Sequence, residues 1–432
     1  MNTPRKLFHI TMASLALSSA AALAQNESPV KPITAFSQPG ARLAVCGDSI
    51  TEQHFYSRFL ELYFTACMPE LKVRQCHWGR GGDTAKNFSS RMENSLREFQ
   101  PTVVTFCFGM NDGLYKEFDP AVGKIYGDSL RGMVNSLAAK GATVFVGGPG
   151  VVDSRYYTRT PGENPAGIYN ATLGQLDAIA KTVAEEAKMP HIPVHDTMME
   201  AMAKAKAALG ADYPVAGKDG IHPLLNGHVI MAYAFLKAMG MNGDLGTITV
   251  DLKGTSAATG GHKVLSGNGG TVEVESSRYP FCFTGDEKSP DGTRSMLPFV
   301  PFNQDLNRLT LVVRNLGAER GQVTWGGASK TFSRQELEQG INLAAAFPEN
   351  PFSGPFDKLD KEIFQKQVFE RQLMWALNDM PMMQDGMASD AEGLAALENV
   401  RKAIWENQAE WEKRVQALFV PVKHTLAVQP AP

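Results

Sequence analysis

Two short motifs, far apart in the chain, carry side chains that can exchange a proton. The first is Gly-Asp-Ser-Ile at 47–50, directly after an apolar run, and the second is Asp-Gly-Ile-His-Pro at 219–223. A separation of three residues lets the Asp219 carboxylate reach Nδ1 of His222, which leaves Nε2 free to take a proton from Ser49. Each motif alone has a plainer interpretation, because a serine at such a turn is commonly a helix cap and a lone histidine is usually structural.

Two further motifs can stabilise negative charge. In Gly-Arg-Gly-Gly-Asp-Thr at 79–84 the glycines let backbone N–H groups face an anion, and in Gly-Met-Asn-Asp at 109–112 the Asn111 amide can donate to a developing oxyanion. The plainer interpretations are a flexible turn in which Asp83 or Thr84 caps a helix, and an Asn-Asp turn. The glycine loop lacks the lysine and the spacing of a phosphate-binding loop. Together the four motifs supply a nucleophile, a base, an orienting acid and two oxyanion donors, as acyl transfer requires.

The order of these motifs resembles that of the SGNH/GDSL hydrolase family. Ser49 matches the nucleophile, Gly82 and Asn111 match the oxyanion glycine and asparagine, and Asp219 and His222 match the last motif. The resemblance covers roughly residues 40–240. It implies that the Ser49 and Gly82 N–H groups and the Asn111 amide hold the oxyanion, with no metal or organic cofactor.

The chain departs from the family pattern at His77, where the family commonly has asparagine before the glycine loop. This departure puts one supporting hydrogen bond of the family in question, but not the assignment of the nucleophile. The Gly-x-Ser-x-Gly turn of lipases is absent, which argues against an α/β-hydrolase.

Alternating apolar runs and helical patterns must position these motifs. Strands are predicted at 43–46, 71–76, 103–108, 143–146 and 192–194, and helical patterns lie between them, including 55–63, 169–188 and one from Leu225. Such alternation predicts a parallel sheet covered on both faces, with sites at the carboxyl ends of its strands. The family resemblance implies a flavodoxin-like three-layer α/β/α domain.

The pattern changes near Gly243. Residues 246–332 are rich in Gly, Thr, Ser and Val, which predicts antiparallel strands in a small β module, and 356–378 and 391–418 are long helical patterns. Residues 426–432 are expected to fray. The predicted organisation is a hydrolase domain at 25–243, a β-rich module at 244–340 and a helical region at 341–432.

The N-terminus has the layout of a secretory signal. Arg5 and Lys6 precede an apolar stretch at 7–22, and Ala22-Leu23-Ala24 offers a cleavage site before Gln25. A signal peptide at 1–24 is therefore expected, with a periplasmic or extracellular mature protein. No later apolar run is long enough to span a bilayer, and no cysteine follows the cleavage site to carry a lipid anchor.

Composition, charge and cysteine content bear on which classes of partner the chain can bind. The chain is 43% hydrophobic and 20% charged, with a net charge of −3 and both signs intermixed, so nothing in its composition indicates a nucleic-acid surface or a polybasic membrane patch. Of the five cysteines, Cys67 and Cys76 could pair, whereas Cys46 and Cys107 lie in apolar strand-like runs that favour buried thiols. No metal-type spacing of Cys and His is present.

The substrate is predicted from weaker signals. The loop at 153–157 combines aromatic and polar groups that suit a sugar, so Arg155 and Tyr156, with Arg80 and Tyr115, are candidate contacts to a small-molecule or glycan ester. An ordinary solvated loop is the plainer alternative. We expect O-deacetylation of a carbohydrate; hydrolysis of short-chain lipid, aryl or thioesters is the second hypothesis. A carbohydrate-binding or scaffold module with an inactive hydrolase half is the third.

Overall fold

A computed structural model describes residues 34–432, except the side chains of 374, 375, 378, 379, 381 and 382. The signal peptide predicted at 1–24, the start of the predicted hydrolase domain and the side chain of Trp375 lie outside this description. Within the described part, no helix is both long and apolar enough to cross a membrane.

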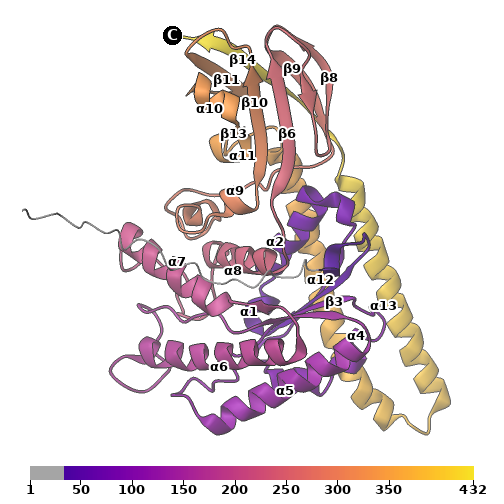
Figure 1. Cartoon of the computed structure of the whole chain (residues 1–432). Helices are drawn as coiled ribbons and strands as arrows, with labels where there is room; N and C mark the ends of the chain where they lie inside the picture. Colours follow the sequence, from indigo (N-terminus) through magenta and orange to yellow (C-terminus); the bar gives the residue numbers. More distant parts are fainter. Residues whose placement is uncertain (1–33) are drawn as a thin grey trace, which may run out of the picture. The chain divides into compact units, whose positions relative to one another are not determined.

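A five-stranded parallel sheet forms the centre of the first half of the chain (Figure 1). Its order is β2-β1-β3-β4-β5, with β1 at Arg42–Gly47, β2 at Arg74–Gly79, β3 at Val103–Cys107, β4 at Thr143–Gly147 and β5 at His191–Ile192. The predicted parallel α/β fold is confirmed. The second strand begins three residues later than predicted, because Pro69–Leu71 forms a 3₁₀ turn that ends in the left-handed region at Lys72 (φ 47°).

Helices cover both faces of this sheet. They are α1 Ser49–Glu52, α2 Tyr56–Leu62, α3 Ala85–Ser89, α4 Met92–Leu96, α5 Pro120–Ala139, α6 Pro165–Ala187, α7 Val194–Leu209 and α8 Leu225–Ala238, with short turns at Thr34–Phe36 and Arg294–Met296 and a π-helical turn at Tyr63–Cys67. Ala44, Cys46 and Val104 face a core shared with α3–α6. The alternate residues of β1 and β3 point to the opposite face of the sheet, where α2 and α7 pack against α8.

The β module consists of two sheets. Its strands and short helices are β6 Asp244–Asp251, β7 Ala257–Ala258, β8 His262–Asn268, β9 Thr271–Ser276, α9 Phe302–Asp305, β10 Arg308–Arg314, β11 Arg320–Trp325, β12 Ala328–Ser333, α10 Arg334–Gln339, β13 Ile341–Asn342 and α11 Leu343–Ala346. One sheet has the order β13-β10-β6-β7 and the other β12-β11-β14-β9-β8, in which β14 is the C-terminal strand Val422–Ala431. The prediction of antiparallel strands is wrong for one pair, because β6 and β10 run parallel.

The helical region returns to the first sheet and then re-enters the module. Helix α12 (Ser353–Gly386) packs against edge strand β2 and against α13 (Ala391–Leu418). Strand β14 (Val422–Ala431) then pairs with β11 and β9. The expectation of frayed residues at 426–432 is wrong, because Leu426 and Val428 are buried in this sheet. The final part of the predicted helical region is thus a strand.

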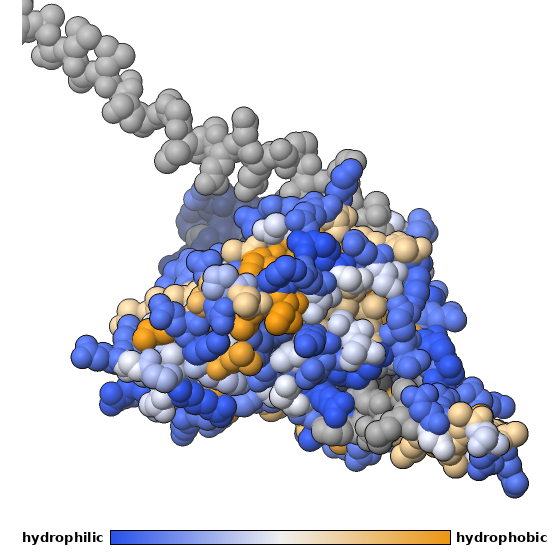
Figure 2. Space-filling view, turned by 90° about the horizontal axis from the view of Figure 1, so that it is seen from below, coloured by the Kyte–Doolittle hydropathy of each residue, from blue (hydrophilic) through white to orange (hydrophobic). Residues whose placement is uncertain are grey.

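The five cysteines are all free and buried. The possible Cys67–Cys76 disulfide is therefore not formed, whereas the buried thiols expected at Cys46 and Cys107 are present. Viewed from below, the surface is mainly hydrophilic around an apolar patch (Figure 2).

Candidate active site

The turn after β1 places a serine hydroxyl at the carboxyl end of the sheet. Asp48, not Ser49, caps α1, since its side chain accepts a hydrogen bond from Ile50 N at 3.0 Å. Ser49 is therefore the first residue of the helix, and its hydroxyl is left for other partners. A side chain at position 47 would have its Cβ 2.0 Å from Thr51 Oγ1, so only glycine allows this turn.

A continuous hydrogen-bonded chain joins the first and last motifs. Ser49 Oγ lies 2.8 Å from His222 Nε2, and His222 Nδ1 lies 2.6 Å from Asp219 Oδ2. The other carboxylate oxygen, Oδ1, accepts the backbone N–H groups of Ile221 and His222, each at 2.9 Å. Burial raises the pKa of Asp219, but these hydrogen bonds outweigh it and hold the pKa below its ordinary value. An ionised Asp219 therefore keeps a proton on Nδ1 and leaves Nε2 able to accept one.

A buried carboxylate holds the loop that carries this acid and base. Asp153 follows β4 and is fully buried, where it accepts Val215 N at 3.0 Å and forms an ion pair with Lys206 at 2.9 Å. Its own N–H donates to Gly220 O at 2.9 Å. Gly220 has φ 80°, and a Cβ there would lie 2.5 Å from Tyr157 N. The two loops thus fit together only with glycine at 220.

A second bridge connects the end of the nucleophile helix to Pro223, the residue after the base. Gln53 Nε2 donates to Pro223 O at 3.1 Å, and Gln53 Oε1 accepts from His228 Nε2 at 3.1 Å. His228 Nδ1 in turn accepts Tyr56 N at 3.2 Å, which fixes the neutral tautomer with the proton on Nε2. Burial lowers the pKa of His228 to about 3, so this tautomer persists at neutral pH.

The oxyanion candidates lie on neighbouring loops. Gly82 adopts φ 72° and borders open space, with no atom within 4 Å of where a Cβ would be. Asn111 Nδ2 donates to Asp83 O at 2.9 Å, which ties the amide to the glycine loop and leaves its second N–H for another acceptor. The Tyr115 hydroxyl donates to Asn111 Oδ1 at 2.7 Å and so fixes which way the amide points.

Buried carboxylic acids lie beneath these loops. Burial raises the pKa of Asp48 to about 8 and that of Asp112 to about 7, and the nearby carboxylate of Asp83 adds to both shifts. Asp83 itself is paired with Arg91. A mainly protonated Asp48 keeps negative charge away from the Ser49 hydroxyl at neutral pH.

The predicted substrate contacts differ in where they lie. Tyr115 is joined to the site through Asn111, and Arg80 follows β2 with its N–H donating to Gly47 O at 3.2 Å. Arg155 and Tyr156 are instead bound to Asp212, at 2.7 Å and 2.6 Å. All four remain predictions as substrate contacts.

His77, the residue that departs from the family pattern, makes a supporting hydrogen bond of its own. His77 is fully buried, and its Nε2 donates to Thr51 O at 2.7 Å, so a hydrogen bond from β2 still supports the nucleophile helix. The plainer interpretation of Thr84 is also correct, because its hydroxyl caps α3 by accepting Asn87 N at 3.1 Å.

Sequence reasoning missed three supporting residues. Asp153 lies in the loop at 153–157 after the fourth predicted strand, but nothing in the sequence of that loop indicates a buried carboxylate. Gln53 and His228 follow Ser49 and His222 by less than two helical turns, but nothing in their spacing relates the two segments to each other. A second Gly-Asp-Ser sequence, at 127–129, lies inside α5, where the Ser129 hydroxyl donates to Ile125 O at 2.8 Å.

Comparisons with known proteins bear on the part of the chain that carries this site. Residues 45–230 match the profile of the GDSL-like Lipase/Acylhydrolase family. This part of the chain is a GDSL-like hydrolase domain. An acetylxylan esterase from Geobacillus stearothermophilus is 26% identical to the chain over 220 residues, which are 46% of this chain and 94% of that protein. The GDSL-like domain thus makes the protein a carboxylic ester hydrolase.

The parts beyond the GDSL-like domain also have a structural counterpart. A solved structure described as a gut microbial diltiazem-metabolizing enzyme aligns with a TM-score of 0.72 at 19% identity, over 91% of this chain and 98% of that one. The fold of most of the described chain, with its β module and helices, therefore recurs. The solved acetylxylan esterase Axe2 from Geobacillus stearothermophilus covers 47% of this chain, with 22% identity and a TM-score of 0.39.

Proposed function

We propose that this protein is an exported serine esterase that removes O-acetyl groups from carbohydrate. The observation that carries the proposal is the hydrogen-bonded chain from Ser49 through His222 to Asp219. The sequence relative named an acetylxylan esterase supports the choice of an acetylated glycan.

The mechanism follows from this chain. His222 Nε2 takes the proton of Ser49, and Oγ attacks the ester carbonyl carbon, giving a tetrahedral oxyanion. The Ser49 and Gly82 N–H groups and the Asn111 amide stabilise that oxyanion. As the carbonyl re-forms, the bond to the alcohol breaks, and His222 gives the proton to the departing sugar oxygen. Water, activated by His222, then cleaves the acetyl–serine ester and releases acetate.

The test is hydrolysis by the purified chain and by Ser49→Ala. The wild type should hydrolyse p-nitrophenyl acetate, release acetate from acetylated xylan and react at Ser49 with a fluorophosphonate probe, and the variant should do none of these. Full activity of Ser49→Ala would overturn the mechanism. A wild type that neither reacts with the probe nor hydrolyses ester would favour the binding-module hypothesis.

The substrate class is tested separately. The same preparation should release acetate faster from acetylated xylo-oligosaccharides than it hydrolyses lipid, aryl or thioesters at equal concentration. A preference for longer acyl chains, or for aryl or thioesters, would replace the carbohydrate proposal with the second hypothesis and leave the mechanism intact.

Export is the remaining part of the proposal. Its support is the charged, apolar and small-residue order at 1–24. The mature protein should be recovered from the periplasm or the medium with Gln25 as its first residue. Intact Met1 on protein recovered from the cytoplasm would refute export.

A further inference from the structure

Helix α12, more than 300 residues after Ser49 in the chain, contacts the helix that carries this serine. Arg371 Nε donates to Glu52 Oε1 at 3.0 Å, and Glu52 is the last residue of α1. The other oxygen of Glu52 lies against the glycine loop, 2.7 Å from where a Cβ of Gly81 would be. The Glu52 carboxylate is thus placed between Arg371 and the residue next to Gly82.

A second route runs from the neighbouring residue of α12. Glu370 is fully buried, and its Oε2 accepts the N–H of His77 at 3.1 Å. His77 Nε2 then donates to Thr51 O in α1 at 2.7 Å. Glu370 therefore acts on the nucleophile helix through one intervening residue.

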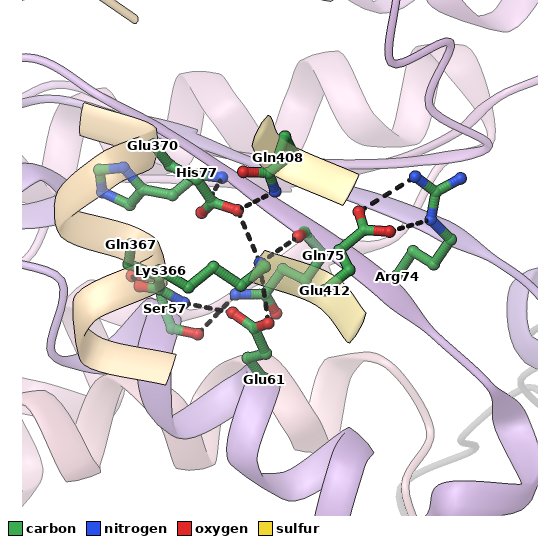
Figure 3. A network of polar contacts seen from close by, with 10 residues as sticks. All are labelled: Ser57, Glu61, Arg74, Gln75, His77, Lys366, Gln367, Glu370, Gln408 and Glu412. Carbon is green, nitrogen blue, oxygen red and sulfur yellow. Dashed lines mark hydrogen bonds and ion pairs between the residues drawn. The ribbon is translucent and has the colours of Figure 1, made fainter. Parts of the chain in front are cut away.

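The Glu370 carboxylate is itself held in place by a buried network (Figure 3). Lys366 Nζ lies 2.6 Å from Glu370 Oε1 and 2.8 Å from Glu61 Oε1, and it also donates to Gln75 O at 2.8 Å. Gln408 of α13 donates to the same oxygen of Glu370 at 2.5 Å. Both C-terminal helices thus contribute to a fixed anchor beneath β2.

The Glu52 carboxylate has an electrostatic consequence for ester hydrolysis. Negative charge develops beside the glycine loop in the proposed transition state, and a second negative charge next to that loop opposes it. The Glu52 side chain is only 14% exposed, so water screens it poorly. The guanidinium of Arg371 offsets this charge, and its hydrogen bond to Oε1 fixes the orientation of the carboxylate beside the loop.

We propose that Arg371 and Glu370 of α12 are positioning residues for the esterase site. Arg371 neutralises and orients Glu52 beside the oxyanion loop, and Glu370 holds the nucleophile helix through His77. This inference rests on the proposed function. The alternative role for α12 is simply to cover edge strand β2.

The chain offers a matched control for Arg371. Arg414 of α13 pairs with Glu362 of α12 at 2.6 Å, with side-chain exposures of 57% and 17%. The Arg371–Glu52 pair has exposures of 49% and 14%. The two ion pairs are therefore alike in exposure, but only one of them adjoins the glycine loop.

The experiment compares Arg371→Ala, Arg414→Ala, Glu52→Gln and the double variant E52Q/R371A in the full-length chain. Hydrolysis of p-nitrophenyl acetate, the rate of fluorophosphonate labelling at Ser49 and the melting temperature are measured for each. Arg371→Ala should lower kcat and the labelling rate about tenfold, with KM within about twofold. Arg414→Ala should leave kcat unchanged. In the Glu52→Gln background, Arg371→Ala should lower kcat less than about twofold, because no charge is left to offset.

Equal kcat values for Arg371→Ala and Arg414→Ala, or an undiminished loss in the Glu52→Gln background, would overturn the role of Arg371. If Arg371→Ala does not fold, Arg371→Gln serves in its place with the same expectations. Glu370→Gln should lower kcat in protein whose circular dichroism matches wild type, and an unchanged kcat would overturn the role of Glu370. Failure of the proposed function is distinguishable, because it would appear as an unlabelled Ser49 in the wild type.

Discussion

The most discriminating test of the proposed machinery is to replace Asp219 by asparagine and, separately, by alanine. Asp219 Oδ1 is held by two backbone N–H groups, from Ile221 and His222. An asparagine must keep its oxygen there, because its amide nitrogen cannot accept those donors. Its NH₂ group then faces His222 Nδ1 and requires that nitrogen to be an acceptor. The proton moves to Nε2, where it blocks proton transfer from Ser49.

The expected losses follow from these contacts. Asp219→Ala removes one charge-assisted hydrogen bond of 2.6 Å to the ring. That bond contributes about 2 kcal/mol, or roughly 30-fold in kcat/KM, and the low end of the range applies because the Asp219 side chain is 46% exposed and water can take its place. Asp219→Asn adds the wrong tautomer, for a total near 5.4 kcal/mol, or about ten-thousandfold. The smaller side chain should therefore be the more active variant.

The assay is steady-state hydrolysis of p-nitrophenyl acetate at neutral pH, with melting curves to show that both variants are folded. A double variant that also carries Ser49→Ala gives the background rate. Asp219→Asn with activity equal to or above that of Asp219→Ala would refute the assigned tautomer. A loss below threefold in both variants would remove Asp219 from the mechanism altogether.

Three further outcomes are expected. Tyr115→Phe frees the Asn111 amide and should lower kcat about fivefold with little change in KM, and the same loss in an Asn111→Ala background would contradict this role. Lys366→Met leaves two buried carboxylates without their cation and should lower the free energy of unfolding in urea by about 4 kcal/mol. Lys361→Met, at an exposed ion pair, should leave it almost unchanged, and equal losses in the two variants would disprove the buried-network account. Burial, aided by a neighbouring histidine, lowers the pKa of His424 to about 4, so the unfolded chain binds more protons below about pH 6.5. Stability should therefore fall by up to about 3 kcal/mol between about pH 6.5 and 4, less so in His424→Gln, and a variant with the wild-type slope would exclude this histidine as the cause.

The sequence predicts the first half of the fold well because local pattern and tertiary role agree there. Val103–Phe108 is an apolar run interrupted only by Thr105, and a strand buried on both faces requires a run of this kind. The four motifs lie at strand ends or ahead of a helix, and the carboxyl ends of parallel strands meet at one edge. The hydrogen bond between Ser49 and His222 follows from that topology.

The supporting structure could not be predicted in the same way. Glu370 and Arg371 lie on a helix whose pattern shows only that it has a buried side. Which strand it covers depends on chain topology, not on local composition. The prediction that residues 426–432 fray failed for a related reason. Alternating residues with a proline near the end resemble a loose terminus until two partner strands are present. The left-handed turn at Lys72 likewise could not be predicted, because no glycine occupies that position.

The position of β14 in the five-stranded sheet of the β module determines how that module can fold. The strand lies at the middle of that sheet, between β11 and β9. Without it, the sheet separates into two hairpins, β8–β9 and β11–β12, each with an open hydrogen-bonding edge. Both long helices, α12 and α13, lie between β9 and β14 in the chain. The pairing of β9 with β14, which completes the sheet, therefore depends on the docking of these helices on the hydrolase sheet. Residues 244–340, although contiguous in sequence, are therefore not an autonomous folding unit, and a fragment cut at those bounds would expose edges prone to intermolecular pairing.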